Sequence, residues 1–311
     1  MPSIVLKTIA ITGGSGNLSQ KLMHHLLTWS GVTRLIGLDV RHPDPEHVAA
    51  LHKAAQPRVV HIDMVQCDLS NPTDQRWQEA IDHADAVVHF AAQNPYPEAT
   101  WNDSAASLDM TLHAALAAVK SPRCRRFVFA TSNHVMGRYK DDPLAGQLQP
   151  GELHTGLEAG VGTVWDTGQT IMDSTAYAVA KFAGERVCRA LAYQSGGKTT
   201  FVCVRIGWCQ PGENRPDTLS ASGSPTLQSS TSQLDPEILA RTEAWFKEMW
   251  LSNRDFVHLF EQALTADASD WPAPWIVVNG MSANTGMKWS IEATKKWLGY
   301  QPLDDVYSGT G

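Results

Sequence analysis

Tyr177 and Lys181 place a phenol and an ammonium group four residues apart in the segment Tyr-Ala-Val-Ala-Lys. Residues four apart share one face of a helix, and the alanines around this pair favour helix formation. A fixed cation stabilises a phenolate, so it lowers the pKa of a nearby tyrosine from its usual value of about 10. The pair therefore predicts a general base. The alternative is an exposed tyrosine whose ring packs on the lysine stem, because this spacing occurs by chance in many helices.

A glycine-rich turn near the N-terminus predicts a site for a nucleotide. Apolar residues at 4–6 and 9–11 predict a strand, residues 20–27 have the periodicity of a helix, and the two are joined by Thr12-Gly13-Gly14-Ser15-Gly16-Asn17-Leu18-Ser19. A strand, a glycine turn and a helix in this order present backbone N–H groups to an anion such as a pyrophosphate. The alternative is a turn that joins the two elements without a ligand.

An acidic residue ends the second expected strand. The apolar segment 34–38 predicts this strand, and Asp39 follows the glycines at the distance of roughly 20 residues that is typical of an acid bound to an adenosine ribose. A carboxylate at this place repels a 2′-phosphate, so NAD is expected in preference to NADP. Arg41 and His42 follow closely, and the choice between the two cofactors therefore stays open.

Further segments predict a parallel sheet that brings the polar residues together. Residues 59–62, 86–92 and 126–132 have the apolar and β-branched composition of strands, and Ser132 ends the last of them. In an open α/β sheet, ligands bind outside the carboxyl ends of the strands. The residues expected to converge at this edge are Gly13, Gly16, Asp39, Ala91 and Ser132.

The expected fold class is α/β, a Rossmann-like doubly wound parallel sheet with a small C-terminal substrate lobe. Residues 1–205 would form the NAD-binding domain with the catalytic groups, and residues 206–311 would form mainly the substrate-binding lobe. Segments 238–251 and 254–260 predict helices of this lobe, and 275–280 predicts a late strand. We expect core positions for Trp245 and Trp297 and a pocket position for Trp208.

Two stretches have the composition of long insertions. The first runs from about 138 to 173 and is rich in glycine, and the second, from about 212 to 235, is a low-complexity segment of Ser, Thr, Pro, Gly and Asn. Long loops without structure of their own are usually lids or disordered segments. Because both begin beside the expected catalytic groups, at least part of them is expected to cover the substrate. For the serine-rich stretch, a mobile excursion is the alternative.

Together these motifs resemble those of the extended short-chain dehydrogenases/reductases of the NAD-dependent epimerase/dehydratase family. The matching residues are Thr12 to Leu18, Asp39, Asp68-Leu69, His89-Phe90-Ala91-Ala92, Thr131 to Gly137, and Tyr177 with Lys181. Within the family the chain is most similar to uronate dehydrogenases, which oxidise C1 of a cyclic sugar acid to a lactone. This closer similarity rests on Ser132-Asn133-His134, Arg205-Ile206-Gly207 with Cys209, Arg254-Asp255-Phe256-Val257, and residues 280–284.

The resemblance implies a role for each group. Ser132 would position the substrate oxygen, Tyr177 would take the proton of the substrate hydroxyl as hydride passes to the nicotinamide, and Lys181 would hold the nicotinamide ribose. Implied cofactor contacts are Gly13, Gly16, Asn17, Leu18, Asp39, Asp68, Leu69, Ala91 and Lys181. Implied substrate contacts are Asn133, His134, Trp208 and Arg215. Ser132 is alternatively a buried serine bonded to backbone, and His134 a histidine that closes its loop.

The expected reaction is the NAD-dependent oxidation of C1 of a cyclic sugar, a hexuronate or another anionic aldose, to its lactone. The anion would meet Arg215, the counterpart of the arginine that grips the carboxylate in uronate dehydrogenases. One alternative is a nucleotide-sugar epimerase or dehydratase that retains NAD, although little chain follows Arg205 to form a nucleotide lobe. The other is a non-catalytic nucleotide sensor, and the presence of both Tyr177 and Lys181 argues against it.

Composition and charge argue against several other classes. The net charge of −7 gives no basic surface for nucleic acid. No apolar run reaches the roughly 18 residues of a membrane helix, and no cleavable leader is evident, so a cytoplasmic protein without a membrane partner is expected. Scattered cysteines without a C-x-x-C motif and histidines without ligand spacing predict neither disulfides nor a metal site. By family analogy, a homodimer or higher homo-oligomer is expected through the Tyr177 helix and the segment 108–119.

Overall fold

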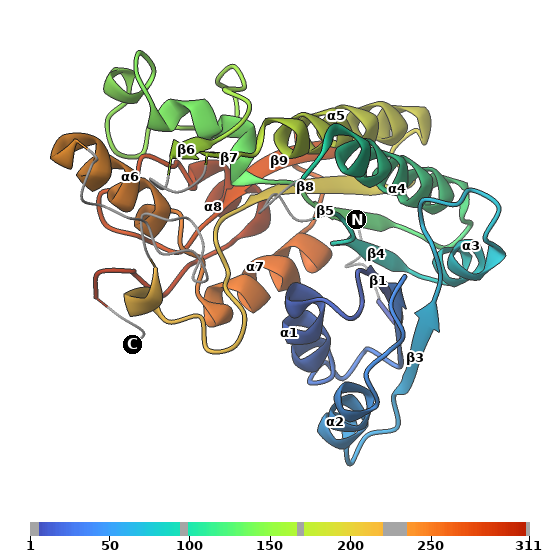
Figure 1. Ribbon diagram of the computed structural model, residues 1–311. Coiled ribbons are helices and arrows are strands. Elements are labelled where there is room, and N and C mark those ends of the chain that lie inside the picture. The colour runs from blue at the N-terminus through green and yellow to red at the C-terminus, as the bar shows by residue number, and fades with distance from the viewer. Residues whose placement is uncertain (1–5, 94–98, 167–170, 220–234, 309–311) are drawn as a thin grey trace.

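The computed structural model describes residues 6–93, 99–166, 171–219 and 235–308. Its body is a sheet of seven parallel strands in the order β3-β2-β1-β4-β5-β8-β9 (Figure 1). The strands are β1 (Thr8–Thr12), β2 (Arg34–Asp39), β3 (His61–Gln66), β4 (Ala86–His89), β5 (Arg126–Ala130), β8 (Thr200–Ile206) and β9 (Trp275–Gly280). The direction of the strand order reverses between β1 and β4. The predicted Rossmann-like doubly wound sheet is therefore confirmed.

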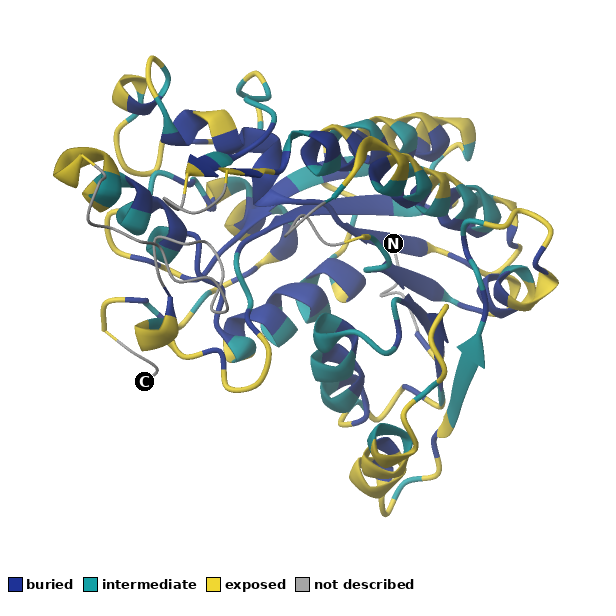
Figure 2. Ribbon diagram, in the orientation of Figure 1, coloured by how far each residue is buried: buried dark blue, intermediate teal, exposed yellow. Residues whose placement is uncertain are grey.

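Helices cover both faces of this sheet (Figure 1). One face carries α1 (Asn17–Leu26), α2 (Pro45–Ala55) and α7 (Asn253–Thr265), and the other carries α3 (Gln75–Asp82), α4 (Trp101–Lys120) and α5 (Thr175–Gln194). Side chains alternate across a strand, so Ile9 and Ile11 of β1 pack with the first group of helices and Ala10 with the second. The central strands β1, β4 and β5 are buried along their whole length, as expected for a parallel sheet covered on both sides (Figure 2).

Local sequence decides where several helices begin and how closely they pack. Thr100 and Asp103 exchange side-chain and backbone hydrogen bonds at the start of α4, which is a capping box. Ser252 caps α7 by accepting the backbone N–H of Asp255. On α5, Gly184 permits a close approach to the sheet, because a Cβ there would lie 2.9 Å from the Phe129 ring.

A smaller lobe beside the sheet is built from segments that are far apart in the chain (Figure 1). It contains the 3-10 helices η1 (Asn133–Lys140) and η2 (Ala145–Gln147), the hairpin of β6 (Val164–Asp166) and β7 (Ile171–Asp173), and α6 (Pro236–Glu248). Buried side chains from these segments, among them Val135, Trp165, Met172 and Trp245, form one apolar cluster, and Trp289 from the segment after β9 is part of it. Near the C-terminus, α8 (Glu292–Leu298) packs on α7 and β9.

The stretch from 138 to 173 is not a loop without structure, so this prediction was wrong for the part that is described. Leu153 and Trp165 are buried in the cluster of the lobe. Its turns pack closely on η1, since a Cβ on Gly137 would lie only 2.1 Å from Thr163 Oγ1. Apolar residues placed between the glycines therefore anchor the segment, and the glycines let its backbone approach its neighbours.

The second expected insertion is described only at its ends. Residues 212–219 include the short 3-10 helix η3 (Pro216–Thr218), and residue 235 caps α6, whereas 220–234 lie outside the described residues. Residues 4–5 of the first expected strand also lie outside the described residues, and β1 itself begins at Thr8.

Other differences from the expected elements are small. β3 begins at His61 rather than at residue 59, because pairing with β2 starts there and Val59 is 85 % exposed. β8 was not predicted as a strand, and it lies between β5 and β9 in the sheet. Trp245 is buried as expected, whereas Trp297 is half-buried at the edge of the core.

Candidate active site

The turn after β1 is rich in glycine, so much of its backbone carries no side chain. Gly13 has φ of +69°, and a Cβ on it would lie 3.1 Å from the backbone nitrogen of Ala91 beyond β4. A Cβ on Gly14 would lie 2.8 Å from Gly37 Cα in β2. Gly16 then begins α1 without a side-chain hydrogen bond to the first turn of that helix. These residues fit a dinucleotide, because a pyrophosphate needs close backbone and a helix N-terminus.

Asp39 lies at the carboxyl end of β2, beside this turn, and its carboxylate is already engaged. It accepts the backbone N–H groups of Ser15 and Arg41, each at 2.9 Å, and both Nε and Nη2 of the Arg41 guanidinium at 3.2 Å. Burial alone would raise the pKa of Asp39, but these hydrogen bonds outweigh it and hold the pKa below its ordinary value. The side chain of Arg41 is 62 % exposed, so a positive charge lies on the solvent side of Asp39, the residue predicted to bind the adenosine ribose.

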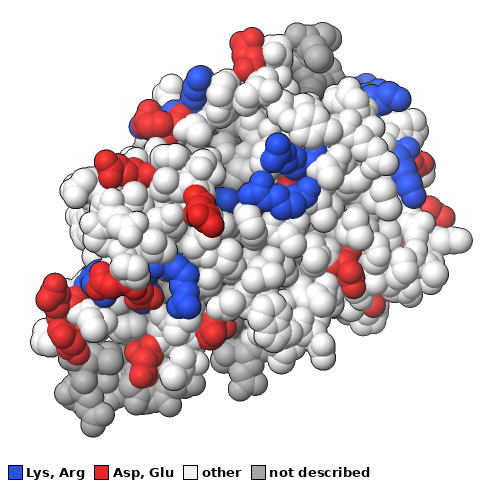
Figure 3. Space-filling model, turned by 90° about the horizontal axis from the view of Figure 1, so that it is seen from above, with Lys and Arg blue, Asp and Glu red and all other residues white. Residues whose placement is uncertain are grey.

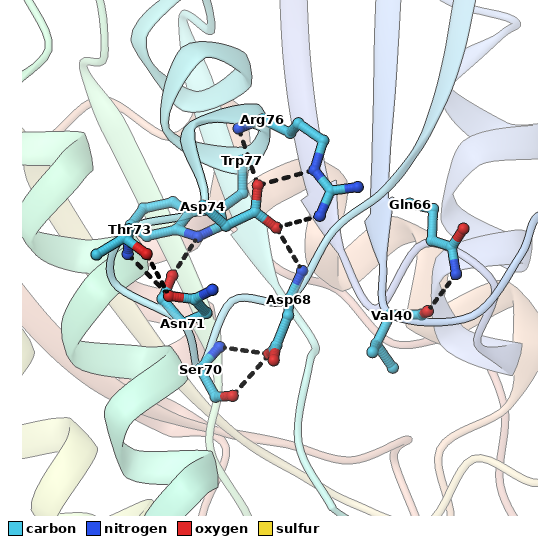
Figure 4. Close-up of polar contacts among 9 residues, drawn as sticks. All are labelled: Val40, Gln66, Asp68, Ser70, Asn71, Thr73, Asp74, Arg76 and Trp77. Atoms are coloured by element: carbon cyan, nitrogen blue, oxygen red, sulfur yellow. Dashed lines mark hydrogen bonds and ion pairs between the residues drawn. The ribbon is translucent and has the colours of Figure 1, made fainter.

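Asp68 belongs to a network that fixes the turn after β3 (Figure 4). Its carboxylate accepts the backbone N–H and the hydroxyl of Ser70, and its backbone N–H donates to Asp74. Arg76 donates to both carboxylate oxygens of Asp74 and lowers the pKa of that group to about 2. Leu69 is buried next to this network. In this arrangement Asp68 shapes the turn at the end of β3.

Asn17 and Leu18 occupy the start of α1. The Asn17 amide donates to the backbone oxygen of Cys209 at 3.3 Å, so it connects the glycine turn to the segment after β8. Leu18 is half-buried and packs on the core. These two residues hold the turn in place from the side of the helix.

Ser132, Tyr177 and Lys181 meet beyond the carboxyl end of β5. The Ser132 hydroxyl lies near the Tyr177 phenol, where it acts to lower the pKa of that group. Lys181 Nζ donates to the backbone oxygen of Ala130 at 2.8 Å and lies 5.5 Å from the centre of the Tyr177 ring. The structure thus brings together the three residues that the sequence predicted as catalytic.

The electrostatics of this group differ from the expected ones. Burial raises the pKa of Tyr177 to about 12, and the Ser132 hydroxyl acts in the opposite direction. Burial also lowers the pKa of Lys181 to about 7. The predicted lowering of the Tyr177 pKa by Lys181 is not found, because the ammonium group faces Ala130 and the phenol ring rather than the phenol oxygen.

Asn133 and His134 follow Ser132 in η1 and are both buried. The Asn133 amide nitrogen donates to the backbone oxygen of Ile206 at 3.0 Å, and no described residue pairs with its amide oxygen. His134 Nδ1 is hydrogen-bonded to Thr163 Oγ1 at 2.8 Å, and its ring lies edge-on to Tyr177 with the centroids 5.9 Å apart. Burial lowers the pKa of His134 to about 4, so this ring is neutral near pH 7. His134 therefore closes the loop that ends at Thr163 and also borders Tyr177.

Trp208 and Arg215 lie on the segment after β8. Trp208 is half-buried, and its ring meets that of Phe246 in the lobe with the centroids 6.0 Å apart. Arg215 is paired at 2.6 Å with Asp217, and both side chains are 61 % exposed. The structure therefore gives Trp208 a place between the sheet and the lobe, whereas Arg215 is engaged at the surface.

One buried histidine of the site was named from the sequence only as part of the family motif, without a role of its own. His89 ends β4, and its two ring nitrogens are hydrogen-bonded to the hydroxyls of Thr12 and Thr111 at 2.7 and 3.0 Å. Burial, followed by the charge of Lys181, lowers the pKa of His89 to about 3. Thr12 also accepts the backbone N–H of Ala91. A histidine in an otherwise apolar strand was the available signal for this network, which ties β1, β4 and α4 together beneath the glycine turn.

Residues 9–208 match the NAD-dependent epimerase/dehydratase family. The chain belongs to this family. The predicted resemblance and the predicted cofactor NAD are thereby confirmed.

Individual relatives extend the similarity along nearly the whole chain. An NAD-dependent glucose-6-phosphate dehydrogenase of Haloferax volcanii is 27 % identical over 96 % of this chain and 93 % of its own length. An L-arabinose 1-dehydrogenase (NAD(P)+) of the same organism is 28 % identical over 96 % of both chains. The solved structure of a mutated uronate dehydrogenase has a TM-score of 0.65, covers 97 % of this chain and 84 % of its own, and at 21 % identity supports the fold. The prediction of an NAD-dependent oxidoreductase that acts on a CH–OH group is confirmed by these relatives.

On the face drawn in Figure 3, Lys and Arg side chains lie in separate small groups with Asp and Glu nearby, and they form no continuous basic surface. None of the helices in the described part of the chain is long and apolar enough to cross a bilayer. Within the described ranges, no three His, Cys, Asp or Glu side chains gather as they would around a metal ion.

Proposed function

We propose that this protein oxidises C1 of a cyclic sugar to the corresponding lactone, with NAD as the hydride acceptor and a hexuronate or another anionic aldose as the preferred substrate. The observation that carries the proposal is the grouping of Ser132, Tyr177 and Lys181 at the same sheet edge as the glycine turn. The similarity to sugar dehydrogenases over nearly the whole chain supports it.

In the proposed reaction, Tyr177 takes the proton of the hydroxyl on C1. Before the sugar binds, the Ser132 hydroxyl faces the phenol and favours the phenolate; with the sugar bound, it donates its proton to the C1 oxygen and holds that oxygen beside Tyr177. NAD, when bound, would supply the acceptor for the hydride of C1. Lys181, held on the backbone oxygen of Ala130, keeps the phenol ring in place from below and donates to the nicotinamide ribose when the cofactor is present.

The raised pKa of Tyr177 has a consequence for this mechanism. A phenol with a pKa of about 12 is almost entirely protonated at neutral pH, so it must lose its proton to a further stabilising charge or act together with the hydride transfer. The positive nicotinamide ring of the oxidised cofactor is such a charge. Activity is therefore expected to increase with pH through the neutral range.

The sugar is proposed to lie against Asn133 and Trp208. The amide oxygen of Asn133 is buried and unpaired among the described residues, and its amide nitrogen is held by Ile206, so the oxygen is fixed in orientation. A fixed, unpaired acceptor suits the hydroxyl of a sugar, because leaving it unpaired costs about 1–3 kcal/mol. The half-buried ring of Trp208 offers an apolar face for a pyranose.

The preference for an anionic sugar rests on Arg215. Its ion pair with Asp217 is exposed on both sides, and such pairs contribute only about 0–1 kcal/mol. An anionic substrate can therefore replace Asp217 as the partner of Arg215 with little loss of free energy. Arg215→Ala should raise the KM for a hexuronate and leave the KM for a neutral aldose unchanged.

We also propose that the protein associates through α4 and α5. These helices lie side by side on the outer face of the molecule, and each exposes an apolar residue there, Leu112 on α4 and Val179 on α5. A homodimer would bury both. Light scattering of the purified protein and of the double variant Leu112→Asp/Val179→Asp tests this: a dimer that the variant converts to a monomer is the expected result. The cytoplasmic location stays a prediction.

The product decides between this function and the alternative of a nucleotide-sugar epimerase or dehydratase, whose chemistry the family also includes. The experiment is to incubate the protein with NAD and a free sugar in the presence of hydroxylamine, which converts a lactone to a hydroxamate. Hydroxamate formed in proportion to NADH supports oxidation at C1. NADH without hydroxamate would place the oxidation at another carbon, and conversion of a nucleotide sugar without net NADH would establish the alternative.

A further inference from the structure

One stripe of α5 binds three consecutive residues at the end of β5. Tyr177, Lys181 and Glu185 are four residues apart, so they lie along one face of the helix. The Lys181 ammonium donates to the backbone oxygen of Ala130, the Thr131 hydroxyl donates to Glu185 Oε1 at 2.9 Å, and the Ser132 hydroxyl lies near Tyr177, in the order 130, 131 and 132. Side chains of the helix thus meet the strand end at each step, with a hydrogen bond at the first two.

Glu185 is fixed from its far side by β8. Arg205 donates to Glu185 Oε1 from Nε at 2.9 Å and to Oε2 from Nη2 at 2.8 Å, and both side chains are almost completely buried. A bidentate pair of this kind sets the orientation of the carboxylate as well as its position. Both strands that flank the pair, β5 and β8, are neighbours in the sheet.

Thr131 and Ser132 lie beyond the last residue of β5, where the ladder of the sheet no longer holds the backbone. Ser132 accepts the backbone N–H groups of His134 and Val135 at the start of η1, and its position towards α5 depends in addition on side-chain bonds such as that of Thr131. A buried ion pair contributes little net free energy to folding, because the cost of removing two charges from water offsets their attraction. The Glu185–Arg205 pair is better explained by the geometry that it imposes.

We propose that Glu185, held by Arg205, is a positioning residue for the reaction, which receives the Thr131 hydroxyl and so keeps Ser132 in contact with Tyr177. This inference rests on the proposed function. Glu185 touches neither the sugar nor the cofactor in this account. It acts through Thr131, and the distance between the Ser132 and Tyr177 hydroxyls is the quantity that it controls.

The test removes the Thr131 hydroxyl and leaves the ion pair intact. In Thr131→Val the shape of the side chain is kept, and Glu185 Oε1 still accepts Arg205 Nε, so no buried charge is left unpaired. Misplacement of a catalytic group by about 1 Å costs on the order of 100-fold in rate. We expect Thr131→Val to lower kcat by about 10- to 100-fold and to leave KM and the Kd for NAD within about twofold of wild type.

Two further variants serve as controls. Thr131→Ser retains the hydroxyl and should restore most of kcat. Thr199→Val removes another buried hydroxyl, which donates to the backbone oxygen of Cys124 at the opposite edge of the sheet, and should leave kcat unchanged. Wild-type kcat in Thr131→Val, or an equal loss in Thr131→Val and Thr199→Val, would overturn the inference while the proposed function stands.

A readout that needs no substrate separates this inference from the proposed function. Lysine labelled for NMR reports the titration of Lys181, whose ammonium is bound to the backbone oxygen next to Thr131. Loosening the strand end admits water, so the Lys181 midpoint should move upward from about 7 in Thr131→Val and stay in place in Thr131→Ser. If wild type oxidises no sugar, the proposed function fails, and an unmoved Lys181 midpoint in Thr131→Val would overturn the inference as well.

Discussion

Lys181 should make the folded protein less stable at low pH, even though the proposed reaction needs it. Its ammonium is almost completely buried, over the ring of Phe129 and on the backbone oxygen of Ala130. Burial lowers its pKa to about 7 from an ordinary value of 10.5. Between these two values the unfolded chain holds a proton at Lys181 that the folded chain has lost. The stability of the wild type therefore rises with pH in this window.

The magnitude follows from the two pKa values. The burial of Lys181 makes folding less favourable by about 5 kcal/mol at about pH 6 and by about 2 kcal/mol at about pH 9, a change of about 3 kcal/mol. Lys181→Met keeps an unbranched side chain of similar length and removes the charge. It also removes the hydrogen bond to Ala130, which costs about 1 kcal/mol at every pH. The variant should thus be more stable than wild type at the lower pH and inactive at both.

The assay is urea unfolding of the cofactor-free proteins at about pH 6 and about pH 9. The difference in free energy of unfolding between Lys181→Met and wild type should shrink by about 3 kcal/mol between the two conditions. Lys295→Met, which changes an exposed lysine on α8, serves as the control and should follow the wild type at both. Parallel pH dependence of wild type and Lys181→Met would refute the reasoning, because it would show that burial does not shift the titration of Lys181.

The remaining predictions concern the reaction and its cofactor. Tyr177→Phe should lower kcat by about 10²- to 10⁴-fold while the Kd for NAD, measured by calorimetry, stays unchanged; near-normal turnover would remove Tyr177 from the role of base. Asp39→Ala should weaken NAD relative to NADP in the ratio of kcat/KM values, and Arg41→Ala should do the reverse by removing the cation that faces a 2′-phosphate. An unchanged ratio in both variants would assign cofactor choice to other residues. The wild-type kcat should rise with pH through the neutral range, in line with the raised pKa of Tyr177, and a flat profile would contradict this.

The sequence was most informative where one local pattern determines the structure. The glycine turn, Asp39 at the end of β2 and the helix of Tyr177 follow from the order of strand, turn and helix, and the structure has them in that order. β9 also occupies the segment predicted for it. β8 was missed, although its residues are apolar, and the boundary of β3 was displaced because pairing with β2 decides where that strand begins.

Features that depend on contacts between distant residues could not be predicted in this way. The structure of residues 138–166 depends on burial of Leu153 and Trp165 against the α6 side of the lobe, and no short-range pattern reports such burial. The pairing of Asp39 with Arg41 changes the charge at the ribose site, which the position of the acid alone does not reveal. The pKa of Tyr177 depends on its burial and on where the Lys181 ammonium points, and the spacing of the two residues fixes neither.

The central claim is best tested by following NADH while the purified protein is incubated with excess NAD and, separately, with L-arabinose, glucose 6-phosphate, glucuronate and galacturonate. The account predicts steady NADH production far beyond one equivalent per enzyme with at least one of these free sugars, and greater kcat/KM for an anionic one. No NADH with any free sugar, together with NAD that remains bound through purification, would contradict the account and favour an enzyme that returns the hydride to its product.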